Sequence, residues 1–233
     1  MASLLSPKIV VKQLLVGRDI GKSNRAGAQM QNFVYLIGDR EAGKAVVVDP
    51  AWDVPGIIAA AKNDGFEIEG ALVTHYHPDH IGGSIFGIDI EGLAQLIALN
   101  PCKVHVHKAE ADGVRTITDL SESDLVRHEG NDKVTVGSIE IELLHTPGHT
   151  PGSQCFRVGD ALISGDTLFL QGCGRVDLPG GDRAEMERTL TQRLATLPDT
   201  LTLYPGHAYG GESAPLADVR KTNPSLGGTR QGR

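Results

Sequence analysis

The most informative stretch of the sequence is Leu72-Val73-Thr74-His75-Tyr76-His77-Pro78-Asp79-His80-Ile81-Gly82-Gly83. Three histidines and an aspartate fall within six positions, directly after an apolar run that favours a strand. Pro78 cannot continue a strand interior, but it suits the first turn of a helix. We therefore expect a strand that ends at this cluster and a helix that begins within it.

This spacing favours metal binding. Alternate residues of extended backbone point the same way, so His75 and His77 can reach one point in space. Asp79 and His80 lie past the turn and can aim at a second point nearby. Imidazoles bind divalent ions, and a carboxylate adds the negative charge that a dication favours. A surface loop that is rich in histidine by chance accounts less well for this pattern and its following glycines. The stretch predicts a metal site.

The composition excludes several classes of function. The chain has 233 residues, of which 40% are hydrophobic, enough for one large domain or two small ones. Its formal net charge is −7, which argues against binding to nucleic-acid phosphates because that relies on clustered Lys and Arg. No run approaches the roughly 18 apolar residues of a membrane span, so we expect no membrane association.

The cysteines and the first residues indicate a cytoplasmic setting. Cys102, Cys155 and Cys173 are widely spaced and odd in number, so they form no disulfide framework. A reducing compartment is therefore expected. Residues 1–6 are too short and too weakly apolar for a signal peptide.

The first third of the chain predicts an antiparallel meander. Its strands are expected at 8–16, 31–37 and 45–49, with a polar, glycine-rich loop at 17–29. The third strand is uniformly apolar, which indicates burial on both faces. Asp49 ends that strand, and two interpretations stay open: it caps the next helix, expected over 54–63, or it orients a histidine.

Further elements follow from periodicity and turn residues. We expect a strand over 66–74, a helix within 85–100, a strand at 103–107, a short helix and a loop over 110–127, hairpins over 133–144 and 155–164, a helix over 183–194 and a strand over 201–204. His105 and His107 should occupy a polar face without binding metal, and His128 should be solvated without partners. The glycine-rich tail, 226–233, should be disordered. No linker divides the chain, so residues 1–233 are expected to form one domain.

Metal-capable residues recur just past the ends of apolar strands. His75, His149, Asp166 and His207 each lie in a turn that is rich in glycine or proline. If their strands share one sandwich core, one rim collects seven candidate ligands: His75, His77, Asp79, His80, His149, Asp166 and His207. A rim of this kind leaves positions open to water and substrate, as catalytic metal sites do.

In this order, the seven residues resemble those of the metallo-β-lactamase superfamily, and the resemblance extends from about residue 32 to 224. It implies an α/β fold, a four-layer αββα sandwich with two metal ions between the sheets. It also implies the ligand sets: His75, His77 and His149 for one ion, Asp79, His80 and His207 for the other, and Asp166 bridging both.

Several segments are similar to the glyoxalase II branch, the hydroxyacylglutathione hydrolases. They are 164–169, 172–175, 204–207 and 222–224. The sequence departs from that branch at two points. The branch carries a helical C-terminal extension that helps to bind glutathione, and these 233 residues stop before one. It also commonly has Asp after the last histidine, where this chain has Ala208.

The resemblance implies hydrolysis of a thioester, such as an S-acylglutathione, at a centre with two zinc ions. Asp79 and Asp166 are the expected catalytic residues: Asp79 orients the attacking water and Asp166 bridges the ions. Arg175 is expected to bind a substrate carboxylate, or else to hold its loop. Tyr209 is expected either to contact the substrate or to be an aromatic side chain at the rim of the site. Cys173 is expected either to line the site or to pack inside its loop. The expected partner is a small molecule, and the sequence leaves the oligomeric state open.

Two alternatives remain. The string 172–177 is similar to persulfide dioxygenases of the same superfamily, which hold a single Fe²⁺ with two histidines and one aspartate. Here these would be His149, Asp166 and either His75 or His77, a ligand set typical of iron oxygenases. The other alternative is a binding protein that the metal stabilises and that turns nothing over.

Overall fold

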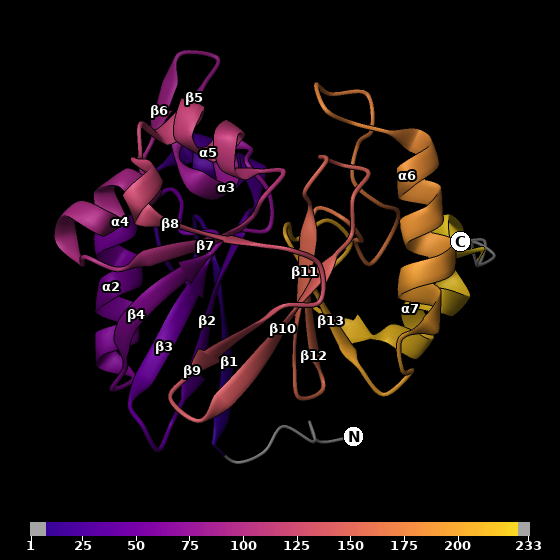
Figure 1. Ribbon diagram of the computed structural model, residues 1–233, viewed down its shortest axis with the longest axis horizontal. Helices are drawn as coiled ribbons and strands as arrows, with labels where there is room; N and C mark the ends of the chain where they lie inside the picture. The colour runs from indigo at the N-terminus through magenta and orange to yellow at the C-terminus, as the bar shows by residue number, and fades with distance from the viewer. Residues whose placement is uncertain (1–7, 228–233) are drawn as a thin grey trace.

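The computed structural model describes residues 8–227. Figure 1 shows two β-sheets face to face, with helices α2 (Val54–Asn63) and α4 (Leu93–Leu99) on one outer side. Helices α6 (Arg183–Arg188) and α7 (Leu216–Thr222) lie on the other outer side. This arrangement confirms the predicted αββα sandwich.

The first sheet joins the predicted meander to three parallel strands. Its order is β1-β2-β3-β4-β7-β8. The pairs β1–β2 and β2–β3 are antiparallel, whereas β3–β4, β4–β7 and β7–β8 are parallel. The strand bounds are β1 Ile9–Leu15, β2 Phe33–Asp39, β3 Lys44–Val48, β4 Glu67–Leu72, β7 Lys103–His107 and β8 Leu125–His128.

The second sheet contains the two predicted hairpins. Its order is β14-β13-β12-β11-β10-β9, antiparallel except where β12 pairs with β13. The strand bounds are β9 Lys133–Val136, β10 Ile139–His145, β11 Gln154–Val158, β12 Ala161–Gly165, β13 Thr202–Pro205 and β14 Ala214–Pro215. Because β12 and β13 are parallel neighbours, their carboxyl ends meet at one edge of the sheet.

Short elements connect these layers. They are α1 Arg25–Met30, α3 Pro78–Ile81, α5 Ala111–Thr118, the hairpin of β5 (Gly83–Ile85) and β6 (Ile88–Ile90), and the turns η1 Glu122–Asp124, η2 Thr189–Arg193, η3 Leu194–Thr196 and η4 Pro224–Leu226. None of the helices within 8–227 combines the length and the apolar character that crossing a membrane requires. Of the tail expected to be disordered, residues 228–233 lie outside the described residues, and Leu226 ends η4.

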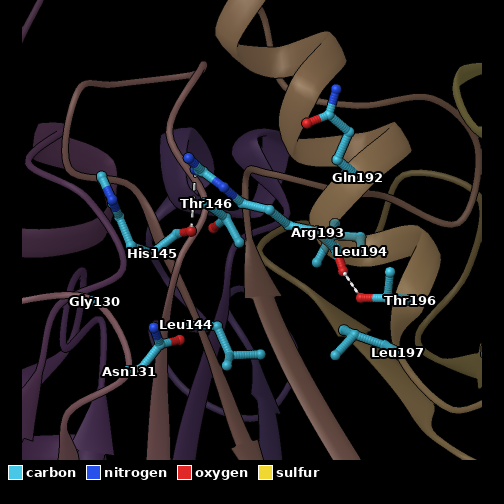
Figure 2. Close-up of a pocket in the computed structure, with 10 residues that line it drawn as sticks. All are labelled: Gly130, Asn131, Leu144, His145, Thr146, Gln192, Arg193, Leu194, Thr196 and Leu197. Carbon is cyan, nitrogen blue, oxygen red and sulfur yellow. Dashed lines mark hydrogen bonds between the residues drawn. The ribbon is translucent and has the colours of Figure 1, made fainter.

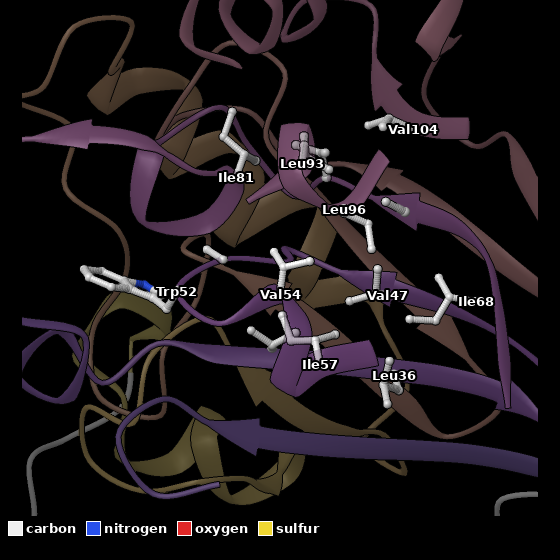
Figure 3. Packing of buried hydrophobic residues seen from close by; sticks show 14 of the residues in the cluster. Leu36, Val47, Trp52, Val54, Ile57, Ile68, Ile81, Leu93, Leu96 and Val104 are labelled. Atoms are coloured by element: carbon white, nitrogen blue, oxygen red, sulfur yellow. The ribbon is translucent and has the colours of Figure 1, made fainter. Parts of the chain in front are cut away.

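Strand β3 is buried on both faces, as its apolar run predicted. Val46 and Val48 pack between the two sheets. Ala45 and Val47 pack on the opposite face, in a core under α2 and α4 that also contains Ile57. Figure 3 shows this second core. Burying each aliphatic side chain of this size contributes about 1.5–3 kcal/mol, so both faces of the strand hold the sandwich together.

The structure corrects two expectations about loops and helices. The predicted loop over 17–29 contains most of α1, whose first turn is capped by Asn24. The helix is too short to show an apolar stripe in sequence. The helix expected within 85–100 is confined to α4, because β5 and β6 form a hairpin before it. Phe86 and Gly87 turn that hairpin with φ of 52° and 79°, and a bulky residue such as Phe rarely adopts this conformation.

Two further element boundaries differ from expectation. Residues 110–127 include the start of β8 besides α5, because this segment pairs with β7. The helix expected over 183–194 is α-helical only to Arg188 and continues as the wider π-type turn η2.

Asp39 ties the far ends of the two sheets together. Its Oδ2 accepts hydrogen bonds from the Ser138 N–H at 2.8 Å and from the Ser138 hydroxyl at 2.6 Å. Its Oδ1 accepts from the backbone N–H groups of Glu41 and Ala42. The hydrogen bonds from Ser138 are the main reason that the pKa of Asp39 falls to about 2.

We expect the substitution Asp39→Asn to lower the free energy of unfolding at pH 7, because an amide places a donor against the donors of Ser138. The folded pKa lies below the unfolded value of about 3.9, so the carboxylate stabilises the fold above pH 4. That contribution disappears as the pH falls through about 2, where Asp39 takes up its proton. Urea unfolding between pH 7 and pH 2 measures the difference.

Glu41→Gln is the matched control, because Glu41 is an exposed acid in the same turn. Its unfolding should follow the wild type throughout. A gap between Asp39→Asn and wild type that stays constant down to pH 2 would contradict this account.

Candidate metal centre

The seven predicted ligands lie together at one edge of the sandwich. His75 follows β4, His149 lies in the loop after β10, Asp166 directly follows β12, and His207 follows β13. Pro78 opens helix α3, as the sequence predicted, and this short helix carries Asp79 and His80. The fold therefore brings four strand ends together, although the first and last of these residues, His75 and His207, are more than a hundred positions apart in sequence.

Three histidines form the first group. Donor atoms of His75, His77 and His149 lie within 4.8 Å of one another, and His77 Nδ1 is 2.9 Å from His149 Nε2. His75 Nε2 is buried and has no hydrogen-bond partner. Burial lowers the pKa of His77 to about 4 and that of His75 well below its usual range. Both rings are neutral at pH 7, the form in which imidazole binds metal.

The second group combines a carboxylate with two histidines. Donor atoms of Asp79, His80 and His207 also lie within 4.8 Å of one another. Burial opposes ionisation of Asp79, but the neighbouring His80 and hydrogen bonds from His207 and Asn32 outweigh it and lower its pKa. Burial likewise opposes charge on His80, but Asp79 and Asp166 raise its pKa to about 9. A cation that binds here would displace imidazole protons.

Asp166 lies between the two groups. Its Oδ2 is 3.7 Å from His149 Nε2 and 3.4 Å from His207 Nε2, and its Oδ1 is 3.4 Å from His80 Nε2. Oδ1 is buried without a hydrogen-bond partner. Burial raises the pKa of this carboxyl, but the surrounding histidines outweigh it and lower the pKa to about 2. A buried anion with an unpartnered oxygen fits a site for divalent cations.

Neighbouring oxygens fix the orientation of three histidine rings. His149 Nδ1 donates to the carbonyl of Arg175 and His207 Nδ1 to that of Met30, both at 2.7 Å. His80 Nδ1 lies 2.9 Å from Asp49 Oδ2. A carbonyl can only accept, so Nδ1 carries the proton in the first two rings and leaves Nε2 as the donor atom facing the centre.

Asp49 therefore orients a histidine, one of the two interpretations that the sequence left open. Helix α2 is capped by Asp53 instead, whose Oδ1 accepts from the Gly56 N–H. Asp49 also accepts from the Thr74 N–H at 2.8 Å and from the Thr74 hydroxyl at 2.6 Å.

Sequence reasoning missed two residues that hold Asp79. Asn32 Nδ2 donates to Asp79 Oδ2 at 3.0 Å. Trp52 Nε1 donates both to Asn32 Oδ1, at 3.1 Å, and to the Asp79 carbonyl, at 2.9 Å. Neither residue belongs to a recognisable motif, so no local signal indicated this contact.

The three candidate substrate residues have different surroundings. The Arg175 side chain is exposed and pairs with Asp177 at 2.9 Å, so only its backbone touches a predicted ligand. The Tyr209 ring stacks parallel to the His207 ring, with centroids 4.7 Å apart, and is 42% exposed. Cys173 is half-buried and packs against the core beneath α6.

The remaining histidines do not join this centre. His105 Nδ1 lies 2.9 Å from His128 Nε2, and His128 Nδ1 lies 3.2 Å from Asp132. The expectation that His128 has no partners is therefore wrong, because parallel pairing places β8 beside β7. His107 stacks on His145 with centroids 3.9 Å apart. Within 8–227, none of these histidines belongs to a group with metal-binding geometry.

A cavity of about 440 Å³ lies between the end of β10 and the turns η2 and η3. Figure 2 shows that Arg193 reaches across it to the carbonyl of His145. None of the seven predicted ligands lines this cavity, so it is separate from the candidate metal centre.

Comparisons with known proteins agree with this geometry. The model of one protein family, described as the Metallo-beta-lactamase superfamily, matches residues 27–207. A hydroxyacylglutathione hydrolase of Polaromonas sp. is 38% identical over 187 residues, which cover 78% of this chain and 64% of that protein. The mitochondrial persulfide dioxygenase ETHE1 of Homo sapiens is 31% identical over 198 residues, which cover 83% and 71% of the two chains.

A solved structure extends the likeness to three dimensions. The crystal structure of ETHE1 from Myxococcus xanthus matches with a TM-score of 0.74 and 27% identity, covering 95% of this chain and 87% of that one. The relatives thus carry the names of two different activities at similar identity, and the chain spans about two thirds of the length of the Polaromonas hydrolase.

The contacts of Asp49 predict unequal effects of two substitutions. Asp49→Ala leaves the buried Thr74 N–H and hydroxyl without an acceptor, and we expect it to lower the free energy of unfolding by about 2–3 kcal/mol. Asp49→Asn keeps one acceptor, and Asn tolerates the φ of 52° at this position. We therefore expect it to lower the free energy of unfolding by about half as much. Urea unfolding of the metal-depleted protein compares them, and equal losses would contradict the assigned contacts.

Proposed function

Because the chain belongs to the metallo-β-lactamase superfamily, we propose that it is a hydrolase of thioesters, such as an S-acylglutathione, with two zinc ions. The observation that carries this proposal is the pair of donor groups joined by Asp166. A site for one ion needs only three or four protein ligands, whereas seven converge here.

The donor chemistry supports this number of ions. We assign the three-histidine group to the first zinc, the group of Asp79, His80 and His207 to the second, and Asp166 to both. His75 Nε2 and Asp166 Oδ1 are buried without hydrogen-bond partners, and a bound cation would coordinate the free lone pair of each.

The reaction consumes one water and releases a carboxylate and a thiol. When bound, a zinc pair lowers the pKa of a coordinated water to about 7 and polarises a carbonyl. Asp79 is ionised and held by Asn32, so its carboxylate can accept a hydrogen bond from the attacking water and orient it. A thiol has a pKa of about 8.5, so the thiolate leaves without a general acid.

Substrate contacts belong to the same proposal. Tyr209 stacks on His207 at the surface, which suits an aromatic that borders the substrate. Arg175 lies in the loop that contacts His149, and its exposed guanidinium can pair with a substrate carboxylate. Cys173, two residues before Arg175 in the same loop, is a third candidate. We further propose a small-molecule substrate, a glutathione conjugate, and a cytoplasmic setting.

Persulfide oxidation is the second candidate, and the 31% identity to the human dioxygenase favours it. One iron would use two histidines and Asp166, and His80 and His207 would then have no ligand role. Yet both rings are fixed through Nδ1, by Asp49 and by the Met30 carbonyl. This positioning favours two ions over one.

Elemental analysis of protein purified without added metal tests the proposal. We expect about two zinc ions per chain, one for each of the two donor groups assigned above. We also expect turnover of S-lactoylglutathione, measured as release of its thiol. About one iron per chain with oxygen uptake on glutathione persulfide would overturn it in favour of the second candidate.

Asp79→Asn distinguishes an enzyme from a protein that the metal merely stabilises. We expect turnover to fall by about 10²–10⁴-fold, because the neutral amide is a poor acceptor for the attacking water. His105→Ala is the matched control, since His105 lies outside the centre. A variant that loses stability while the wild type shows no turnover would favour the binding protein.

A further inference from the structure

Glu110 is a buried carboxylate that belongs to neither donor group. It directly precedes α5, and its side chain is 0% exposed. Within 8–227 it has no ion pair with Lys, Arg or His. Burying an unpaired carboxylate costs free energy unless hydrogen bonds compensate for the lost water. The hydrogen bonds of Glu110 must therefore offset this cost.

Both of its oxygens accept backbone hydrogen bonds, from two separate segments. Oε2 accepts from the N–H of Tyr76 at 2.8 Å, and Oε1 accepts from the N–H of Gly152 at 2.6 Å. Tyr76 lies between His75 and His77, and Gly152 lies three residues after His149. One side chain thus joins the two segments that carry the three-histidine group.

The packing around Glu110 allows little movement. A Cβ atom at Gly152 would lie 2.7 Å from Glu110 Cγ and 2.8 Å from His107 Nδ1. A Cβ atom at Gly113, in α5, would lie 2.9 Å from the Tyr76 ring. Real Cβ atoms do not approach so closely, so glycine at both positions lets helix and loops meet.

The two oxygens of an acidic side chain suit this bridge better than an amide does. They accept two N–H groups at once, whereas the amide of Gln offers one oxygen and a donor that repels the second N–H. A neutral pair of contacts could stabilise the fold at lower desolvation cost. Two acceptor oxygens on one side chain, bonded to two separate segments, point to a demand on geometry.

We propose that Glu110 is a positioning residue that sets the spacing between the His75–His77 pair and His149, and thereby the zinc affinity of that group. This inference rests on the proposed function in one respect, the use of these histidines as ligands. Residues that hold ligands in place typically affect metal affinity by about 10–100-fold.

The test measures binding of zinc alone, by competition with a chelator at pH 7.5. In Glu110→Gln we expect the weakening of one zinc affinity by about 10–100-fold and no change in the other, because the two segments that Glu110 joins carry the three-histidine group. Hydrogen exchange of the metal-depleted variant should show faster exchange of the Tyr76 or the Gly152 amide.

Asp39→Asn is the matched control, since it removes a buried carboxylate at the opposite end of the sandwich. It should lose stability and keep both zinc affinities. Equal zinc affinities in Glu110→Gln and wild type would overturn the inference alone, as would an equal loss of affinity in the two variants. A wild type that takes up no zinc would overturn the proposed function and this inference together.

Discussion

Two ionised carboxylates buried among five imidazoles are the constraint that shapes this protein. Asp79 and Asp166 keep their negative charge because histidines surround them, not because water does. Such a cluster is unfavourable in an apolar core unless positive charge is supplied from within. Protons on His80 and His207 supply part of it, and a pair of divalent ions would supply it fully. Hydrogen bonds from the surrounding fold orient three of the imidazole rings, so that their other ring nitrogen faces the centre.

Those contacts come mostly from backbone and from residues outside any motif. The carbonyls of Arg175 and Met30 fix Nδ1 of two imidazole rings, and Asp49 orients a third ring. The backbone of Arg175 therefore helps to orient His149, although the Arg175 side chain faces solvent. Glycines allow this closeness: a Cβ at Gly174 would lie 1.9 Å from the carbonyl oxygen of Asp166, so no other residue fits there.

The same donor set suits two chemistries, and the number of ions separates them. A single iron with two histidines and one carboxylate leaves open positions for oxygen. Two zinc ions would use every donor in the cluster. The relatives of this chain carry the names of two activities, hydroxyacylglutathione hydrolase and persulfide dioxygenase. Because a fold hosts many reactions, the occupied centre and not the sandwich distinguishes the two.

The αββα sandwich was expected from the resemblance to the metallo-β-lactamase superfamily, and the two sheets confirm it. The convergence of the ligands could be expected from the residues only on the condition that four strand ends share one core, since four of the ligands lie just past such ends. The role of Asp49 stayed ambiguous until the fold placed it against His80. Asn32, Trp52 and Glu110 were not predictable, since each acts on a residue 27 or more positions away. The partners of His128 were likewise missed, because parallel strand pairing is a long-range property. Local patterns report which residue types follow one another, whereas hydrogen bonds between distant segments exist only once the sheets have paired.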